Sequence, residues 1–366
     1  MSGRALRRWL LTLAAFFAAY FALRTSRAAM NALWYGVICP AEQWLGRLWG
    51  GWSLSVGEVL IVTAVCAALI AATNGIRYIV SARRKWRAAA QVLTTALCTV
   101  LTVYAGFCLL WGVGYNTDGF REKSGLTTAP VTADQLAQVT AYFADQLALS
   151  AGEVPRDGDG VCRLDYRQLL TGSESSLDVL TEEFPFLDAK TGRAKAFGCS
   201  RALSALRFTG FYFPFTGEAN VNTDSPSAFL PATVCHEMAH QRGITAEEEC
   251  NFIGILAAIR SDCAAYRYSG WLTGFGYLSN ALYSADPDLA RASYAALCAE
   301  AQADMADNNA YWKQWEGPVK ETGEKVYTAF LQGYGQKLGM RSYGACVDLL
   351  VEEFLPYTTT GGLTAE

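Results

Sequence analysis

The chain has 366 residues, of which 52% are hydrophobic, and its formal net charge is −4. This acidic balance argues against a protein that binds nucleic acid, because such a protein would present a basic surface. The charge is divided unevenly: residues 1–114 carry a net charge of +9 and residues 115–366 a net charge of −13, so a basic hydrophobic part precedes an acidic one.

Three long apolar segments predict that residues 1–115 form a membrane domain. The expected helices, at about 9–24, 52–74 and 88–114, contain almost no charged residues, and crossing a bilayer takes about 20 residues. The first has an uncharged core of 15 residues, so its flanking arginines are expected to reach the lipid headgroups. A cleaved signal peptide is the alternative for the first segment, and buried core helices are the alternative for the other two.

The distribution of arginine and lysine predicts the orientation of these helices. Three arginines precede the first helix, and the basic cluster Arg83–Arg87 lies between the second and the third. Because positively charged loops stay on the cytoplasmic side, we expect a cytoplasmic N-terminus and an extracytoplasmic location for everything after the third helix. The aromatic residues of segment 28–52 then predict an outer aromatic belt or interfacial helix, with packing in a protein core as the alternative.

Residues 116–131 are polar and rich in glycine and threonine, so we expect a linker, followed by a domain over residues 132–366. The aromatic segment 206–221 contains Gly and Pro and predicts an edge strand. Cys162 and Cys199 are a candidate disulfide pair. The expected fold is mainly α-helical with little β-sheet. Helices are predicted at 132–151, 231–242, 245–266, 288–314, 319–337 and 342–355.

The two histidines of the chain, His236 and His240, lie in the motif His-Glu-x-x-His. On a helix, residues four apart share one face at about 6 Å, so both imidazoles can bind one Zn²⁺ ion. Glu237 points in a neighbouring direction and can reach a zinc-bound water without binding the metal, which is the arrangement of zinc metallopeptidases. A pair of ordinary surface histidines is the alternative interpretation.

A sharp turn after this helix is expected to bring a third ligand to the metal. Gly243 can end the helix in the left-handed conformation. Thr245 can cap the next helix, with Glu248 completing a capping box. The second helix then starts close to the two histidines, and its first turn contains three successive glutamates.

Glu247 is the predicted third ligand, and Glu249 is the alternative. Asn251 lies one turn after Glu247 on the same face, where its amide can orient a ligand by a hydrogen bond. Glu249 lies on the apolar face of the same helix. The acidic residues of this turn can also be explained by the favourable interaction of negative charge with a helix N-terminus.

Substrate contacts are expected just before the histidine helix. Zinc peptidases commonly bind a peptide as an added strand beside the metal, and Gly217, Asn220 and Asn222 are placed to contact such a strand, with Glu218 as a structural residue. An ordinary turn is the alternative for this segment. A donor to the developing oxyanion is also required. The candidates for this donor are Tyr266, Tyr268 and Arg242, with packing as the alternative role of each tyrosine.

The motifs resemble those of the glutamate-ligand zinc peptidases, in which a second helix supplies the third ligand. More closely, the chain resembles an uncharacterised family of bacterial three-span membrane proteins with a zincin-like ectodomain that contains this histidine motif. The resemblance implies a zinc-peptidase-like fold and no known substrate. The matching segments are FPFTGEANVN (Phe213–Asn222), HEMAHQRG (His236–Gly243), EEECNFIG (Glu247–Gly254) and RSYGACVDLL (Arg341–Leu350).

The sequence therefore predicts a membrane-anchored zinc metallopeptidase in which Glu237 activates a zinc-bound water and the catalytic domain is extracytoplasmic. The expected partners are a peptide or protein substrate and the lipid bilayer, and no nucleic acid. Two other functions remain open: a non-catalytic zinc-binding membrane receptor or scaffold, and a hydrolase of a non-peptide amide in the cell envelope.

Overall fold

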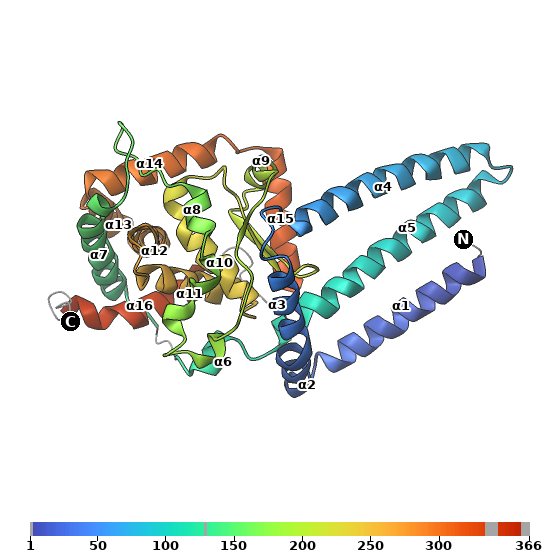
Figure 1. Cartoon of the computed structure of the whole chain (residues 1–366), viewed down its shortest axis with the longest axis horizontal. Coiled ribbons are helices and arrows are strands. Elements are labelled where there is room, and N and C mark those ends of the chain that lie inside the picture. Colours follow the sequence, from blue (N-terminus) through green and yellow to red (C-terminus); the bar gives the residue numbers. More distant parts are fainter. Residues whose placement is uncertain (1–2, 128–129, 334–342, 360–366) are drawn as a thin grey trace.

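A computed structural model of the chain describes residues 3–127, 130–333 and 343–359 (Figure 1). Three long helices, α1 (Gly3–Leu23), α4 (Val56–Ser81) and α5 (Lys85–Phe107), project from one side of a domain formed by the later residues. Both α1 and α4 pack against α5. The predicted fold class is confirmed, because the described chain is mostly helical and begins with three membrane-length apolar helices.

The surfaces of these helices are apolar and largely uncovered. In the most apolar stretch of α4 only 6% of the residues are buried, and Leu69 and Ile70 are both more than 60% exposed. A π-helical turn, Cys108–Gly112, extends the apolar length of α5 to 28 residues. A helix satisfies its own backbone hydrogen bonds and can therefore present such a surface to lipid. The chain is thus a membrane protein.

The first turn of α4 is anchored in the domain by two carboxylates. The side chain of Glu218 accepts hydrogen bonds from the first two backbone N–H groups of the helix, at 3.1 and 2.6 Å. Glu58 accepts two more from the backbone N–H groups of Gly198 and Cys199. Negative charge at a helix N-terminus is favourable, so the helix begins at Val56 instead of residue 52.

The segment between α1 and α4 folds onto the domain. It forms α2 (Arg27–Leu33), a π-helical turn (Trp34–Ile38) and α3 (Cys39–Leu48). Trp34 is fully buried, and its indole N–H donates to the carbonyl oxygen of Gly243 at 3.0 Å. Trp34 therefore packs in the protein core, which was the alternative to an outer aromatic belt. Trp44, in contrast, is 56% exposed.

The centre of the domain is formed by α10 (Leu230–Gln241), α11 (Glu247–Ile259) and α12 (Ala264–Ala285), with α7 (Ala133–Ser150) against α12. As predicted, Thr132 caps α7. Two expected helices are each divided: 245–266 into α11 and α12, and 288–314 into α13 and α14. The other described helices are α6 (Phe120–Ser124), α8 (Tyr166–Leu170), α9 (Ser200–Ala205), α13 (Pro287–Ala295), α14 (Ala299–Lys313), α15 (Pro318–Gly333) and α16 (Tyr343–Thr359).

α12 continues to Ala285, beyond the predicted end of a helix at residue 266. Glycine disfavours a helix interior, and this helix contains Gly270, Gly274 and Gly276. A Cβ atom at Gly270 would lie 2.7 Å from a backbone nitrogen of α11, and one at Gly274 would lie 2.3 Å from the Phe143 ring of α7. Two of the glycines therefore permit close helix packing, which outweighs their low helix propensity.

A small sheet lies beside α10, with strand order β1 (Lys195–Ala196), β3 (Glu218–Val221), β2 (Gly210–Phe213). β3 is parallel to β1 and antiparallel to β2. The segment 206–221 was expected to supply an edge strand, and it forms the hairpin β2–β3. The edge strand is β2, whereas β3 is central and fully buried.

The first half of the expected linker is packed against the domain. Within residues 116–131, α6 begins at Phe120, which is fully buried and contacts the rings of Phe184 and Phe252. Glu249 accepts hydrogen bonds from the N–H groups of Phe120 and Arg121, at 2.8 and 3.1 Å. The carboxylate thereby caps α6 from α11.

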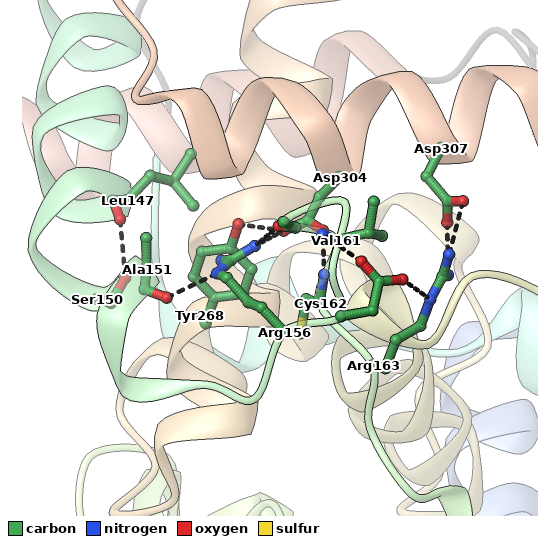
Figure 2. Close-up of polar contacts among 12 residues, drawn as sticks. Leu147, Ser150, Ala151, Arg156, Val161, Cys162, Arg163, Tyr268, Asp304 and Asp307 are labelled. Atoms are coloured by element: carbon green, nitrogen blue, oxygen red, sulfur yellow. Dashed lines mark hydrogen bonds and ion pairs between the residues drawn. The ribbon is translucent and has the colours of Figure 1, made fainter.

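A buried carboxylate joins α12, α14 and the loop after α7 (Figure 2). Asp304 accepts hydrogen bonds from the hydroxyl of Tyr268, the guanidinium of Arg156 and the N–H of Cys162. All eleven cysteines lie in the described part of the chain and all are free. The predicted disulfide between Cys162 and Cys199 is wrong: Cys162 is buried beside Asp304 and Cys199 is exposed at the start of α9.

Candidate metal centre

The two histidines are one helical turn apart on α10, with ring centroids separated by 4.9 Å. The helix ends just before Gly243, which has φ +93°, so this glycine adopts the predicted left-handed conformation. In the turn that follows, the carbonyl oxygen of Ile244 lies 2.8 Å from Nδ1 of His240. A hydrogen bond from Nδ1–H to this carbonyl leaves Nε2 of His240 free to accept a bond from a metal ion.

Glu247 completes a cluster of three possible ligands. Its carboxylate oxygens lie 3.4 Å from Nε2 of His236 and 3.7 Å from Nε2 of His240. Burial would raise the pKa of Glu247, but the adjacent histidines hold this pKa well below its usual value. One candidate ligand atom from each residue lies within 4.8 Å of the others. Two imidazole nitrogens and one carboxylate are a donor set that suits Zn²⁺ and leaves a fourth position open.

Gly254 brings α11 close to the histidine helix. A Cβ atom at this position would lie 2.8 Å from the backbone nitrogen of His236 and 3.0 Å from its Cα. Gly254 lies two helical turns after Glu247 and therefore on the same face of α11. Because Gly254 has no side chain, α11 can pack closely against α10. This close packing brings Glu247 within reach of the two histidines.

Glu237 is buried beside the cluster. Its Oε2 atom has no hydrogen-bond partner, and burial raises the pKa of its carboxyl group to about 7. A buried carboxylate oxygen without a partner is costly unless another polar group reaches it. A metal-bound water beside the three donors would supply that group, so the residues fit a zinc site.

The expected turn chemistry before α11 is wrong in its details. Ala246, not Thr245, precedes the helix, and no side-chain hydrogen bond caps its start. The capping box of Thr245 and Glu248 therefore does not form. Glu249 points to α6, where it binds two backbone N–H groups, so the structure places the alternative ligand outside the cluster.

The cluster lies in a cavity of about 890 Å³. His236, Glu237, His240, Glu247 and Asn251 all line this cavity. Its volume falls within the range of about 300–1,000 Å³ that is typical of ligand-binding sites. Asn251 is thus placed one turn after Glu247 as expected, and its role in orienting a ligand stays a prediction.

The residues predicted to bind substrate lie elsewhere. Asn220 and Asn222 are fully buried, and the Asn222 amide donates to the hydroxyl of Ser204 at 2.9 Å. Gly217 forms the hairpin turn with φ +66°, and its carbonyl accepts a hydrogen bond from Gln241. None of the three lines the cavity in the described structure. Their hairpin partner β2 lines it instead, through Gly210, Phe211 and Tyr212.

The three predicted oxyanion donors are bonded to other groups. The hydroxyl of Tyr266 donates to a backbone carbonyl at 2.7 Å, and that of Tyr268 donates to Asp304. Arg242 pairs with Asp178 at 2.5 Å and is buried. None of these side chains is part of the described cavity wall, so each has a structural role.

The comparison with protein families matches the chain over most of its length. The family model described as a protein of unknown function (DUF3810) matches residues 35–351. The chain belongs to the DUF3810 family. No curated protein and no solved structure matches it. The matched region includes α4 and α5 together with the metal-site helices, so the DUF3810 unit contains membrane helices as well as the domain.

Three tyrosines of this DUF3810 protein line the cavity and were not anticipated: Tyr115, Tyr212 and Tyr277. The hydroxyl of Tyr212 donates to the buried Glu42 at 2.9 Å, and its ring centroid lies 6.4 Å from that of His240. Burial, and then the negative charge of Glu247, raise the pKa of Tyr115. Burial likewise raises the pKa of Tyr212, so both phenols are neutral, and the hydroxyl proton of Tyr212 is directed to Glu42. They come from segments distant in sequence, so no local motif could have indicated them.

Proposed function

We propose that the protein is a membrane-anchored zinc metallopeptidase with an extracytoplasmic catalytic domain. The observation that supports this best is the convergence of four groups on one cavity wall: the donors of His236, His240 and Glu247, and the buried carboxylate of Glu237. The first three would hold Zn²⁺. When bound, zinc lowers the pKa of its water to about 7 and polarises the scissile carbonyl group.

Glu237 would move the proton. Its pKa of about 7, raised by burial, suits a group that must both accept and donate a proton near neutral pH. The carboxylate accepts a proton from the attacking water at Oε2 and returns it to the leaving amine. A Cβ at Gly210 would lie 2.5 Å from Oε1 of Glu237, so the glycine at the start of β2 leaves room for the carboxylate.

The free edge of β2 favours a peptide as substrate. The N–H of Asn222 donates to the carbonyl of Thr209, and Phe211 is paired with Asn220. Because hydrogen-bonded pairs alternate in an antiparallel ladder, the backbone groups of Gly210 and Tyr212 point away from β3. An extended peptide can therefore add to this edge inside the cavity, beside the metal cluster.

The test is hydrolysis of a quenched-fluorescent peptide library by the purified, zinc-loaded full-length chain. We expect Glu237→Gln to lower the rate by at least about 100-fold, because proton transfer typically contributes 10²–10⁴-fold. Zinc content, measured by elemental analysis, should be unchanged. Glu248→Gln is the matched control, because Glu248 lies outside the cavity wall, and it should retain activity.

The same variants separate the enzyme from a zinc-binding scaffold. Where deletion of the gene gives a phenotype, the wild-type gene should restore normal behaviour. If the protein is an enzyme, neither Glu237→Gln nor His236→Ala should restore it. Full restoration by Glu237→Gln together with failure of His236→Ala would reject the hydrolase and leave a structural metal.

A further inference from the structure

The cavity that contains the metal cluster extends into the membrane part of the chain. Besides the histidines, its wall includes Ile61, Val62, Val65 and Cys66 of α4. Counted at 1.5 Å per residue, these positions lie about 8 to 15 Å beyond the first residue of α4. Val62 and Val65 are 49% and 54% exposed. One continuous space therefore joins the three candidate metal ligands to a part of α4 that faces lipid.

The lining residues of α4 form one stripe, because positions 61, 62, 65 and 66 share a helix face. At the end of α5 the wall continues with Phe107 and Trp111. On the domain side it continues with apolar side chains of the segment 197–208, among them Leu206, which is 39% exposed. We call this apolar part of the cavity the lipid-side groove.

The hairpin β2–β3 holds the two helices that border the groove. A Cβ at Gly57 on α4 would lie 2.8 Å from the ring of Phe213, and a Cβ at Gly106 on α5 would lie 3.1 Å from the ring of Phe215. The two rings contact each other, with centroids 5.5 Å apart. Together with the anchoring of the first turn of α4 by Glu218, these contacts fix the groove next to β2.

We propose that the lipid-side groove binds the hydrocarbon chain of an acylated peptide, while the peptide lies along β2 at the metal cluster. This inference rests on the proposed peptidase function and names its substrate class. A soluble peptide would leave the part of the cavity on α4 without an occupant. An acylated peptide matches both parts, because its chain is apolar and its amide bonds are polar.

The extended edge of β2 argues against a transmembrane helix as the occupant. A helix satisfies its own backbone hydrogen bonds and cannot add to β2 as a strand, whereas an extended peptide can pair with the outward backbone groups of Gly210 and Tyr212. A peptide that lies on β2 and also reaches the groove on α4 therefore does so through an attached apolar chain.

The experiment uses full-length Glu237→Gln protein in lipid nanodiscs with a palmitoylated heptapeptide that carries a diazirine on its acyl chain. Mass spectrometry maps the photoadducts. We expect adducts within residues 61–66 of α4 that excess unlabelled palmitoyl peptide suppresses. Val62→Trp and, from the domain side, Leu206→Trp should each reduce them at least about ten-fold by filling the groove. Leu60→Trp is the matched control, because Leu60 lies on the opposite face of α4.

Activity gives the second readout. Wild-type protein should cleave the palmitoylated peptide with a KM at least about ten-fold below that for the same peptide without the chain. Val62→Trp should remove this preference and Leu60→Trp should keep it, with thermal unfolding confirming that both fold. Three results would each overturn the inference. They are adducts spread evenly over α1, α4 and α5, equal labelling of α4 by a diazirine phospholipid, and cleavage of a transmembrane segment in preference to the palmitoylated peptide.

Failure of the proposed function would give a different result. If wild-type protein cleaves both peptides with equal KM, the peptidase stands and the acyl site is rejected. If competed adducts form on α4 but neither peptide is cleaved, the acyl-binding groove is supported and the peptidase is rejected.

Discussion

Glu247 and Glu249 are two residues apart on α11 but contact different partners. Glu247 lies within 4 Å of both histidines, whereas Glu249 binds the backbone of α6. We predict that Glu247→Ala abolishes zinc binding. Glu249→Ala should keep the zinc but lower the free energy of unfolding by about 1–3 kcal/mol for each buried N–H group left without a partner.

Elemental analysis and thermal unfolding of the two variants, purified in parallel, check this prediction. Glu249→Gln is a useful third variant, because its amide oxygen can still accept one of the two hydrogen bonds and should restore part of the stability. Zinc loss in Glu249→Ala with full zinc content in Glu247→Ala would assign the third ligand to Glu249 instead.

At the residue scale, the sequence was informative where one local motif contains the geometry. The spacing of His236, Glu237 and His240 on a helix places them on the cavity wall without reference to the rest of the chain. Tyr212 and Tyr115 reach the same cavity from a hairpin and from the end of a membrane helix. Their proximity depends on tertiary packing, which a single sequence does not specify.

The approach of α11 to α10 depends on one glycine. We predict that Gly254→Ala displaces α11 from His236 and moves Glu247 away from the metal. Because a misplacement of about 1 Å can cost about 100-fold in rate, activity should fall by about 10- to 100-fold, and zinc affinity should fall with it. A chromophoric chelator in competition with the protein measures the affinity.

Gly276→Ala on α12 is the control for this prediction. A Cβ atom there meets no other atom within 4 Å, so the same substitution adds a methyl group to a helix without a collision. Equal zinc affinities for the two variants would mean that Gly254 does not set the position of Glu247.

Two carboxylates on α14 should differ sharply in their contribution to stability. Asp304 is fully buried and pairs with the largely buried Arg156, whereas Asp307 pairs with the half-exposed Arg163 (Figure 2). We expect Asp304→Ala to destabilise by about 3–5 kcal/mol, because it leaves a buried cation without its partner. Asp307→Ala should cost no more than about 1 kcal/mol. Chemical denaturation measures both, and equal losses would contradict the assignment.

At the scale of elements, patterns of apolar residues located most helices but not their breaks. The run from Glu247 was expected to continue to residue 266, yet α11 ends at Ile259 and a new helix begins at Ala264. The length of α12 was missed because its glycines disfavour a helix when only propensity is considered. Gly270 and Gly274 are explained by neighbours on α11 and α7, which become visible only in the folded chain.

At the scale of the whole molecule, composition predicted a membrane part followed by an acidic domain. It did not indicate that the two parts build one cavity. The wall includes side chains from α4 and from the end of α5, and the family match from residue 35 to 351 covers these helices with the domain. The membrane helices are therefore part of the proposed site as well as its anchor.

The distribution of basic residues predicts the orientation of the molecule in the membrane. The basic cluster Arg83–Arg87 lies at the far end of α4 and α5 from the domain (Figure 1), so a cytoplasmic cluster places the metal centre outside. The exposed Cys263, between α11 and α12, should react with a membrane-impermeant maleimide on intact cells in which the exposed Cys66 and Cys199 are replaced by serine. Lys85→Cys, made with Cys263→Ser and with the partly exposed Cys298 also replaced by serine, should react only after lysis. The reverse pattern would place the domain with the candidate metal centre in the cytoplasm and contradict the predicted orientation.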